Sequence, residues 1–122
     1  MRTWIKSWLV VAGVSVAFAG LARADEVADK QFKKYCQKCH GAEGKGDGPE
    51  GATLAEKPKD FTDCAAMAKE SDDKLFEVVK TGGKAIAGKK SEMPAMGKSL
   101  SDDEIKGLVA KVRSFCAAGG KP

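Results

Sequence analysis

The stretch Tyr35-Cys36-Gln37-Lys38-Cys39-His40-Gly41 has two cysteines three positions apart, directly before the one histidine of the chain. This spacing is typical of a covalent attachment site for haem c. Each cysteine sulfur can form a thioether bond with one vinyl group of the porphyrin, and two intervening residues let one helical turn span the gap. His40 would then bind the iron from the proximal side. The stretch therefore predicts one haem, attached through Cys36 and Cys39 and ligated by His40.

Three other kinds of site use a similar cysteine spacing. A thioredoxin-like dithiol normally lies beside a βαβ pattern, and no strand-like alternation flanks Cys36. A zinc site needs four ligands, usually with a second Cys or His pair, whereas Cys64 and Cys116 are far apart in sequence. A disulfide between Cys36 and Cys39 would close a small strained loop with little to stabilise. The histidine after Cys39 favours haem over all three.

Residues 1–24 have the layout of a secretory signal peptide. The basic Arg2 and Lys6 precede an uncharged apolar run over residues 8–21, and the segment ends in Ala22-Arg23-Ala24. The apolar run is shorter than the roughly 20 residues that a membrane span needs. We therefore expect cleavage after Ala24, which leaves residues 25–122 as one domain. An uncleaved membrane anchor is the alternative.

Cleavage would change the charge balance of the chain. The 21 basic and 17 acidic residues become 18 and 17, a net charge of +1, because Arg2, Lys6 and Arg23 leave with the signal. A nearly neutral domain gives little support for nucleic-acid binding. Export also permits a structural disulfide and favours the bacterial periplasm. The expectation is a periplasmic monomer with no stable membrane insertion after cleavage.

Apolar residues at helical spacing predict a first helix over residues 26–37 and a last helix near the C-terminus. In the first helix, Ala28, Phe32 and Tyr35 share one face, and the helix continues into the cysteine motif. Ser101-Asp102-Asp103-Glu104 has the pattern of a capping box. The last helix then has an apolar stripe formed by Ile105, Leu108, Val109, Val112, Phe115 and Cys116. We expect these two helices to pack against each other.

A shorter helix is predicted over residues 72–80, with Ser71 as its N-cap and Gly82-Gly83 as its stop. Its apolar set is Leu75, Phe76, Val78 and Val79. Residues 52–63 and 84–100 are expected to be irregular.

Residues 41–51 contain five glycines and a proline, which excludes a helix or a core strand. A phosphate-binding loop is disfavoured because no strand precedes it and no Gly-Lys-Ser/Thr follows. We expect the loop to wrap the proximal haem face, with the Pro49 carbonyl accepting a hydrogen bond from the free ring nitrogen of His40.

The second axial ligand cannot be a histidine of this chain, which leaves methionine, lysine, water or an empty position. Met67 is expected to fill the core. Met93 and Met96 lie in the second irregular segment, and Pro94 stiffens the backbone that would present Met93. Met93 is therefore the predicted distal ligand, with Met96 as the alternative. Two protein ligands leave no site for a substrate, which argues for electron transfer and against an enzyme.

Cys64 and Cys116 are 52 residues apart. Two leftover cysteines in an exported protein most often pair. Such a disulfide would tie the last helix to the loop that follows the glycine-rich segment, and it would stabilise by about 4 kcal/mol in the chain-entropy model. Two free buried thiols and a redox switch are the alternatives.

The chain resembles the small monohaem class I cytochromes c of bacteria. The resemblance is carried by Cys36–Gly41, Gly44–Pro49, Met93–Ala95 and Leu100–Ile105, and it covers nearly all of residues 26–116. It implies an all-α class I cytochrome c fold, in which the N- and C-terminal helices pack beside one covalently bound haem c. It also implies proximal ligation by His40, distal ligation by Met93 and an exposed haem edge for partners.

Two positions depart from the family pattern. Ala28 stands four residues before Phe32, where the family usually has glycine, and Lys111 beside Ala110 stands where the last helix often has an aromatic residue. Both departures concern the contact between the two helices and leave the haem motif intact.

The function expected from these features is one-electron transfer between an unidentified donor and an unidentified acceptor, both redox proteins. Lys84, Lys89, Lys90 and Lys98 flank the methionine segment and would steer an acidic partner. Scattered, solvated lysines are the simpler alternative. The rival functions are a haem-based sensor or gas-binding cytochrome with a displaceable distal ligand, and a small haem enzyme.

Overall fold

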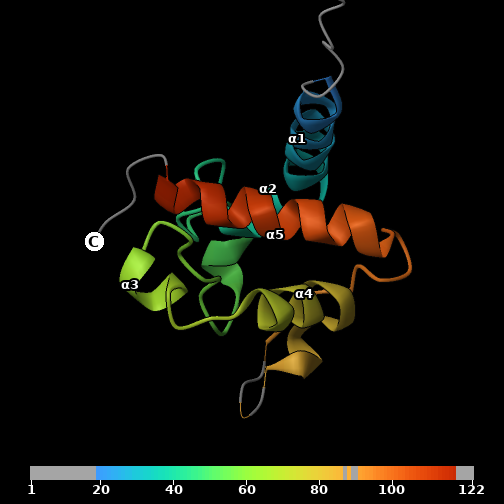
Figure 1. Cartoon of the computed structure of the whole chain (residues 1–122). Helices are drawn as coiled ribbons and strands as arrows, with labels where there is room; N and C mark the ends of the chain where they lie inside the picture. The colour runs from blue at the N-terminus through green and yellow to red at the C-terminus, as the bar shows by residue number, and fades with distance from the viewer. Residues whose placement is uncertain (1–18, 87, 89–90, 118–122) are drawn as a thin grey trace, which may run out of the picture.

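The computed structural model describes residues 19–86, 88 and 91–117, and Figure 1 shows helices joined by loops, with no strand in these residues. In chain order the elements are α1 (Ala19–Gln31), the π-helical turn η1 (Phe32–Cys36), α2 (Gln37–His40), the 3₁₀ turn η2 (Gly51–Thr53), α3 (Cys64–Met67), α4 (Asp72–Thr81), the 3₁₀ turn η3 (Gly82–Ala85) and α5 (Asp102–Ala117). The all-α prediction is confirmed.

Most of the predicted signal peptide, residues 1–18, lies outside the described residues. Helix α1 begins at Ala19, before the predicted cleavage site, and cleavage after Ala24 stays a prediction. Among the described helices, none combines the length and the apolar character that crossing a membrane requires.

Helices α1 and α5 cross steeply and pack against each other, as predicted (Figure 1). Ala28 is buried at the crossing, and a methyl group added at Gly107 would lie 3.7 Å from its Cβ. Ala28 stands where the family usually has glycine, and the glycine at this crossing is Gly107 on α5. Lys111, which stands where an aromatic residue is common, forms an ion pair of 2.7 Å with Asp29.

The buried core lies between the first helix, α5 and the irregular segments. It consists of Phe32, Phe61, Met67, Leu100, Ile105, Leu108 and Val112. Apart from Val109, the predicted stripe of α5 faces this core, and Met67 fills it as expected, with 1% of its surface exposed. Met67 is the last residue of α3.

The predicted helix caps are present. The Ser71 hydroxyl accepts a hydrogen bond of 3.1 Å from the Lys74 amide, and Gly82 ends α4 with a φ of 76°. At α5, the Ser101 amide donates to Glu104 Oε2 (2.8 Å), and the Glu104 amide donates to the Ser101 hydroxyl (3.3 Å). These are the two reciprocal bonds of a capping box.

The predicted secondary structure is wrong in detail at three places. The first helix extends beyond residues 26–37, because α1, η1 and α2 follow one another without a break from Ala19 to His40. The segments expected to be irregular contain most of η2 and part of η3, because Gly51 and Gly82-Gly83 begin single tight turns that extend into them. Cys64 begins the one-turn helix α3, because Asp63 caps that turn by accepting from the Ala66 amide at 3.0 Å.

Candidate haem-binding site

The cysteine motif occupies the C-terminal end of the first helical segment. Cys36 closes the π-helical turn, and Cys39 and His40 lie in α2, one helical turn further on. The helix ends at Gly41, which has a φ of 82° and whose amide donates to the Gln37 carbonyl at 2.9 Å. Cys36 and Cys39 are both free and half-buried. The turn thus presents two thiols and the imidazole from adjacent positions.

The pKa values of both thiols are raised above the ordinary range. Burial, reinforced by the nearby Cys39, raises the pKa of Cys36 to about 11. Burial and the negative charge of Glu50 also raise the pKa of Cys39. Thioether formation adds a sulfur and a hydrogen across a vinyl double bond, so a neutral thiol contains both atoms that the product needs.

His40 is held as a neutral imidazole of defined tautomer. Burial lowers its pKa, which favours the uncharged ring. Its Nδ1 lies 3.3 Å from the Lys59 carbonyl oxygen. Because a carbonyl only accepts hydrogen bonds, Nδ1 carries the proton in this bond and the lone pair of Nε2 is available to a metal. Two neutral thiols and such an imidazole fit the attachment and proximal ligation of haem c.

The predicted role of Pro49 is wrong, because the carbonyl facing Nδ1 belongs to Lys59. Pro49 is exposed on the glycine-rich loop. The segment containing Pro58 and Lys59 passes close to Gly46, where an added Cβ would collide with the Pro58 carbonyl. Gly46 therefore allows a later part of the chain to reach the histidine.

The glycine-rich loop closes the end of α2 through backbone hydrogen bonds. Gly46 donates to the His40 carbonyl at 2.7 Å, Gly48 to that of Cys39 at 3.1 Å, and Glu50 to that of Lys38 at 2.9 Å. A side chain at Gly48 would collide with the Lys38 carbonyl. The loop thus satisfies helix-end carbonyls that would otherwise lack partners, and its glycines allow the close approach.

Phe61 is a site residue that sequence reasoning missed. Its ring stacks on the His40 imidazole with a centroid distance of 4.5 Å and an interplanar angle of 17°. The segment around it has no helical or strand periodicity, so nothing in the pattern linked this aromatic residue to the histidine. An isolated aromatic residue in an otherwise polar loop was the one available signal.

The segment that contains Met93 is fixed to the C-terminal end of α4. The Gly83 amide donates to the Met93 carbonyl at 2.8 Å, and the Met96 amide donates to the Val79 carbonyl at 2.9 Å. A Cβ at Gly82 would lie 2.6 Å from the Met93 carbonyl oxygen. Gly82 therefore both ends α4 and allows this segment to lie against it.

Met93 and Met96 are both half-buried. Of the two, only Met96 belongs to the described side chains that pack against the buried core. Distal ligation by Met93 stays a prediction.

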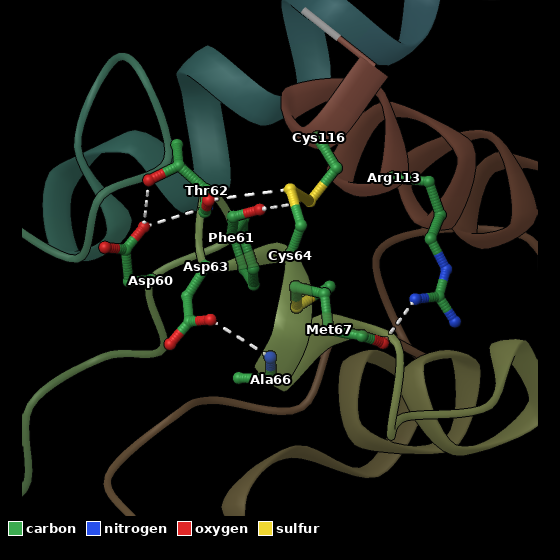
Figure 2. The surroundings of a disulfide bond; sticks show 9 residues. All are labelled: Asp60, Phe61, Thr62, Asp63, Cys64, Ala66, Met67, Arg113 and Cys116. Carbon is green, nitrogen blue, oxygen red and sulfur yellow. Dashed lines mark hydrogen bonds between the residues drawn. A yellow bond between two sulfur atoms is a disulfide. The ribbon is translucent and has the colours of Figure 1, made fainter. Parts of the chain in front are cut away.

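Cys64 and Cys116 are joined by a disulfide bond with a Cα–Cα distance of 5.5 Å (Figure 2). The bond links the start of α3 to the end of α5. Arg113, one turn earlier on α5, donates to the Met67 carbonyl at 2.7 Å (Figure 2). α5 is therefore tied to α3 by a covalent bond and by a side-chain hydrogen bond.

Comparison with known proteins points to one family. The family model described as "Cytochrome C oxidase, cbb3-type, subunit III" matches residues 23–110. A solved structure titled "KustC0563 c-type cytochrome" is 28% identical; the match covers 72% of this chain and 95% of that one, with a TM-score of 0.59. No curated protein matches the chain.

A second solved structure is a chain of the "Kuenenia stuttgartiensis reducing HAO-like protein complex Kustc0457/Kustc0458". It is 30% identical with a TM-score of 0.61, and the match covers 84% of this chain but only 48% of that one. The present chain thus spans about half the length of that relative.

Three findings point to the same kind of protein, a c-type cytochrome. They are the helical fold, the thiols and imidazole on one helical turn, and the family match. They also agree with the class I cytochrome c resemblance read from the sequence. Members of such families carry electrons on a covalently bound haem c. The chain belongs to the cbb3-type cytochrome c oxidase subunit III family, and it is a small c-type cytochrome of the class I fold.

Proposed function

We propose that this protein is a periplasmic one-electron carrier with a single haem c, attached through Cys36 and Cys39 and ligated by His40 and Met93. The observation that carries the proposal is the bond between His40 Nδ1 and the Lys59 carbonyl, made beside two free, half-buried cysteines. It leaves Nε2 as a metal-binding atom on the same helical turn as both points of covalent attachment.

Bound haem c supplies the one-electron couple of its iron. The role of the protein is to hold the attachment and ligand residues in place around the haem. Cys36 in η1 and Cys39 in α2 would each form one covalent bond to the haem, and the Lys59 carbonyl holds the plane and tautomer of the His40 ring. A rigid set of ligands keeps the reorganisation that accompanies electron transfer small.

Met93 is the proposed distal ligand because its segment is anchored on both sides while its side chain is not part of the described core packing. The Met93 carbonyl accepts from Gly83, and Met96 is fixed through its amide and packs on the core. A thioether ligand favours ferrous iron and raises the reduction potential. A protein ligand on each face also leaves no coordination site for a substrate, which supports a carrier rather than an enzyme.

Electron exchange requires contact with a donor and an acceptor, which we propose to be redox proteins. One of the similar chains belongs to a protein complex, which supports direct contact with protein partners. Lys84 and Lys98 are exposed on either side of the methionine segment and would attract an acidic surface, while Lys89 and Lys90 lie outside the described residues. A steep fall of the association rate with ionic strength would support this role.

Expression in a bacterium with a haem-ligation system tests the attachment. The exported protein is expected to begin at Asp25 and to have the mass of residues 25–122 plus one haem. Cys36→Ala and Cys39→Ala should each remove one of the two thioether bonds. A mass equal to the bare polypeptide would contradict the proposal.

The visible spectrum of the ferric protein tests the distal ligand. A weak far-red band that reports a methionine–iron bond should be lost completely in Met93→Ala and retained in the matched control Met96→Ala. The reverse pattern would assign the bond to Met96. A high-spin ferric parent that binds carbon monoxide readily once reduced would instead support the sensor or gas-binding function.

A further inference from the structure

Three aromatic rings form a continuous stack that begins at the candidate proximal ligand. The Phe61 ring lies 4.5 Å from the His40 ring at 17°, and the Phe115 ring lies 6.2 Å from Phe61, also at 17°. Phe61 is 7% exposed, and its ring centroid also lies 6.5 Å from that of Phe32, at an interplanar angle of 64°. The His40 imidazole is therefore the inner end of a stack that reaches α5.

The backbone of Phe61 forms a hydrogen bond on one side and contacts the disulfide on the other. Its amide donates a hydrogen bond of 2.7 Å to the Gly44 carbonyl in the glycine-rich loop. Its carbonyl oxygen lies 3.3 Å from the sulfur of Cys116 (Figure 2). Gly44 also makes room for the stack, because a Cβ at this position would lie 2.9 Å from the ring of Phe115.

The disulfide closes the outer end of the same stack. Cys116 directly follows Phe115, and Cys64 comes three residues after Phe61, so one covalent bond joins the two segments that supply the outer rings. Figure 2 shows Phe61 next to the two joined sulfurs, with Met67 and Arg113 in the same region. The disulfide thus limits the movement of Phe115 relative to Phe61, and through Phe61 relative to His40.

We propose that Phe61, held by the Cys64–Cys116 disulfide, is a positioning residue for the proximal ligand. Its ring fixes the plane of the imidazole, so that Nδ1–H stays directed at the Lys59 carbonyl. This role rests on the proposed function, in which His40 binds the iron. In this proposal the disulfide influences the reduction potential of the haem iron as well as the stability of the fold.

The consequence concerns the reduction potential. A hydrogen bond from Nδ1–H to a carbonyl makes the imidazole a stronger electron donor, which stabilises ferric iron. If the ring rotates away from Lys59, this bond weakens and ferrous iron is favoured. Loss of the Phe61 ring should therefore raise the midpoint potential.

The test compares Phe61→Leu with Phe76→Leu in the haem-loaded protein. Both changes replace a phenyl ring by an aliphatic side chain, but Phe76 belongs to α4 and lines an open groove between α4 and α5 with residues such as Asp72 and Val109. Phe76 also packs against the buried core, but it is not one of the three stacked rings. The midpoint potential should rise in Phe61→Leu and stay at the parent value in Phe76→Leu. Equal potentials in the two variants would overturn the proposal.

Hydrogen exchange provides a second measurement. His40 is the one histidine of the chain, so its Nδ1–H signal in the NMR spectrum of the ferrous protein has a single assignment. Exchange of this proton with solvent should be faster in Phe61→Leu than in the parent or in Phe76→Leu. If Phe61→Leu does not fold, Phe115→Leu removes the outer ring and should change exchange and potential in the same direction. Parent values in Phe115→Leu would then overturn the proposal.

The double variant Cys64→Ala/Cys116→Ala tests the contribution of the disulfide. It should raise the potential in the same direction as Phe61→Leu, and the change should not add to that of Phe61→Leu when the two are combined. An unchanged potential in the double variant would refute the role of the disulfide.

Failure of this inference is distinguishable from failure of the proposed function. A parent protein without covalent haem, or without histidine ligation, contradicts the function itself. A parent that has both, together with a Phe61→Leu variant of unchanged potential and exchange, contradicts only the positioning role.

Discussion

His40 depends for its tautomer and orientation on residues about twenty positions later in the chain. The Lys59 carbonyl faces Nδ1, and Phe61 stacks on the ring. Lys59 and Phe61 belong to a segment that passes close to the glycine-rich loop. This segment can approach His40 only where the loop has no side chain. Gly46 is such a position, since its φ of 75° and the nearby Pro58 carbonyl both exclude a Cβ.

Gly46→Ala should therefore destabilise the protein by more than backbone strain alone. A non-glycine residue in the left-handed region costs roughly 1–3 kcal/mol. Gly88 is a matched control, because its φ is 74° but nothing lies within 4 Å of an added Cβ. Thermal unfolding of both variants should show the larger loss in Gly46→Ala, and only that variant should speed exchange of the His40 Nδ1–H. Equal losses would mean that the close approach to Pro58 is unimportant.

The motif and the contacts around it were predictable to different degrees. Covalent chemistry fixes the spacing of Cys36, Cys39 and His40, so these residues stand out in the sequence without any knowledge of the fold. The hydrogen-bond acceptor of His40 has no such constraint. Pro49 is nearer to His40 in sequence, but the tertiary path of residues 52–63 brings the Lys59 carbonyl to the ring instead.

Helix ends were predictable because the groups that satisfy them are local. Ser71, Gly82 and the capping box at Ser101 all act within one turn of their helix. The π-helical turn Phe32–Cys36 and the contact between Ala28 and Gly107 were not predictable. The contact depends on how two helices distant in sequence meet, which no periodicity within either helix encodes.

The capping box of α5 predicts an acid dependence of stability. Hydrogen bonds from the Ser101 backbone and side chain, and one of 2.6 Å from Gln31, lower the pKa of Glu104 from its usual value near 4.5. The folded state thus binds the proton of Glu104 less readily than the unfolded state. This contribution to stability is fully present above pH 4.5 and is lost as the pH falls through the lowered pKa.

Substitutions at Ser101 and Glu104 should separate the contribution of the cap hydrogen bonds from that of the Glu104 charge. Ser101→Ala is expected to cost about 1 kcal/mol at neutral pH. Glu104→Gln should lose less stability than the parent when the pH is lowered from 6 to 3, because it has no carboxylate to protonate. Urea unfolding at several pH values measures both. Parallel curves for Glu104→Gln and the parent would contradict the assigned role of Glu104.

At the scale of the whole molecule, three connections hold the same small core together. α1 and α5 cross at Ala28 and Gly107, the Met93 segment is anchored to α4, and the Cys64–Cys116 disulfide joins α3 to α5. A mature chain of 98 residues, from Asp25 to Pro122, would have a core of marginal size. Covalent links are therefore expected to contribute a large share of its stability.

Removal of the Cys64–Cys116 disulfide should measure its contribution to the free energy of unfolding. In the chain-entropy model, a bond that closes a loop of this length stabilises by about 4 kcal/mol, because it restricts the unfolded chain. The haem-loaded Cys64→Ala/Cys116→Ala variant should unfold at lower urea concentration and with a steeper dependence on urea, since its unfolded state exposes more surface. The Gly88→Ala variant keeps the disulfide and is the control for an ordinary loss of stability, in which the urea dependence stays the same. A double variant with unchanged slope and a loss below about 1 kcal/mol would show that the unfolded chain is little restricted by this bond.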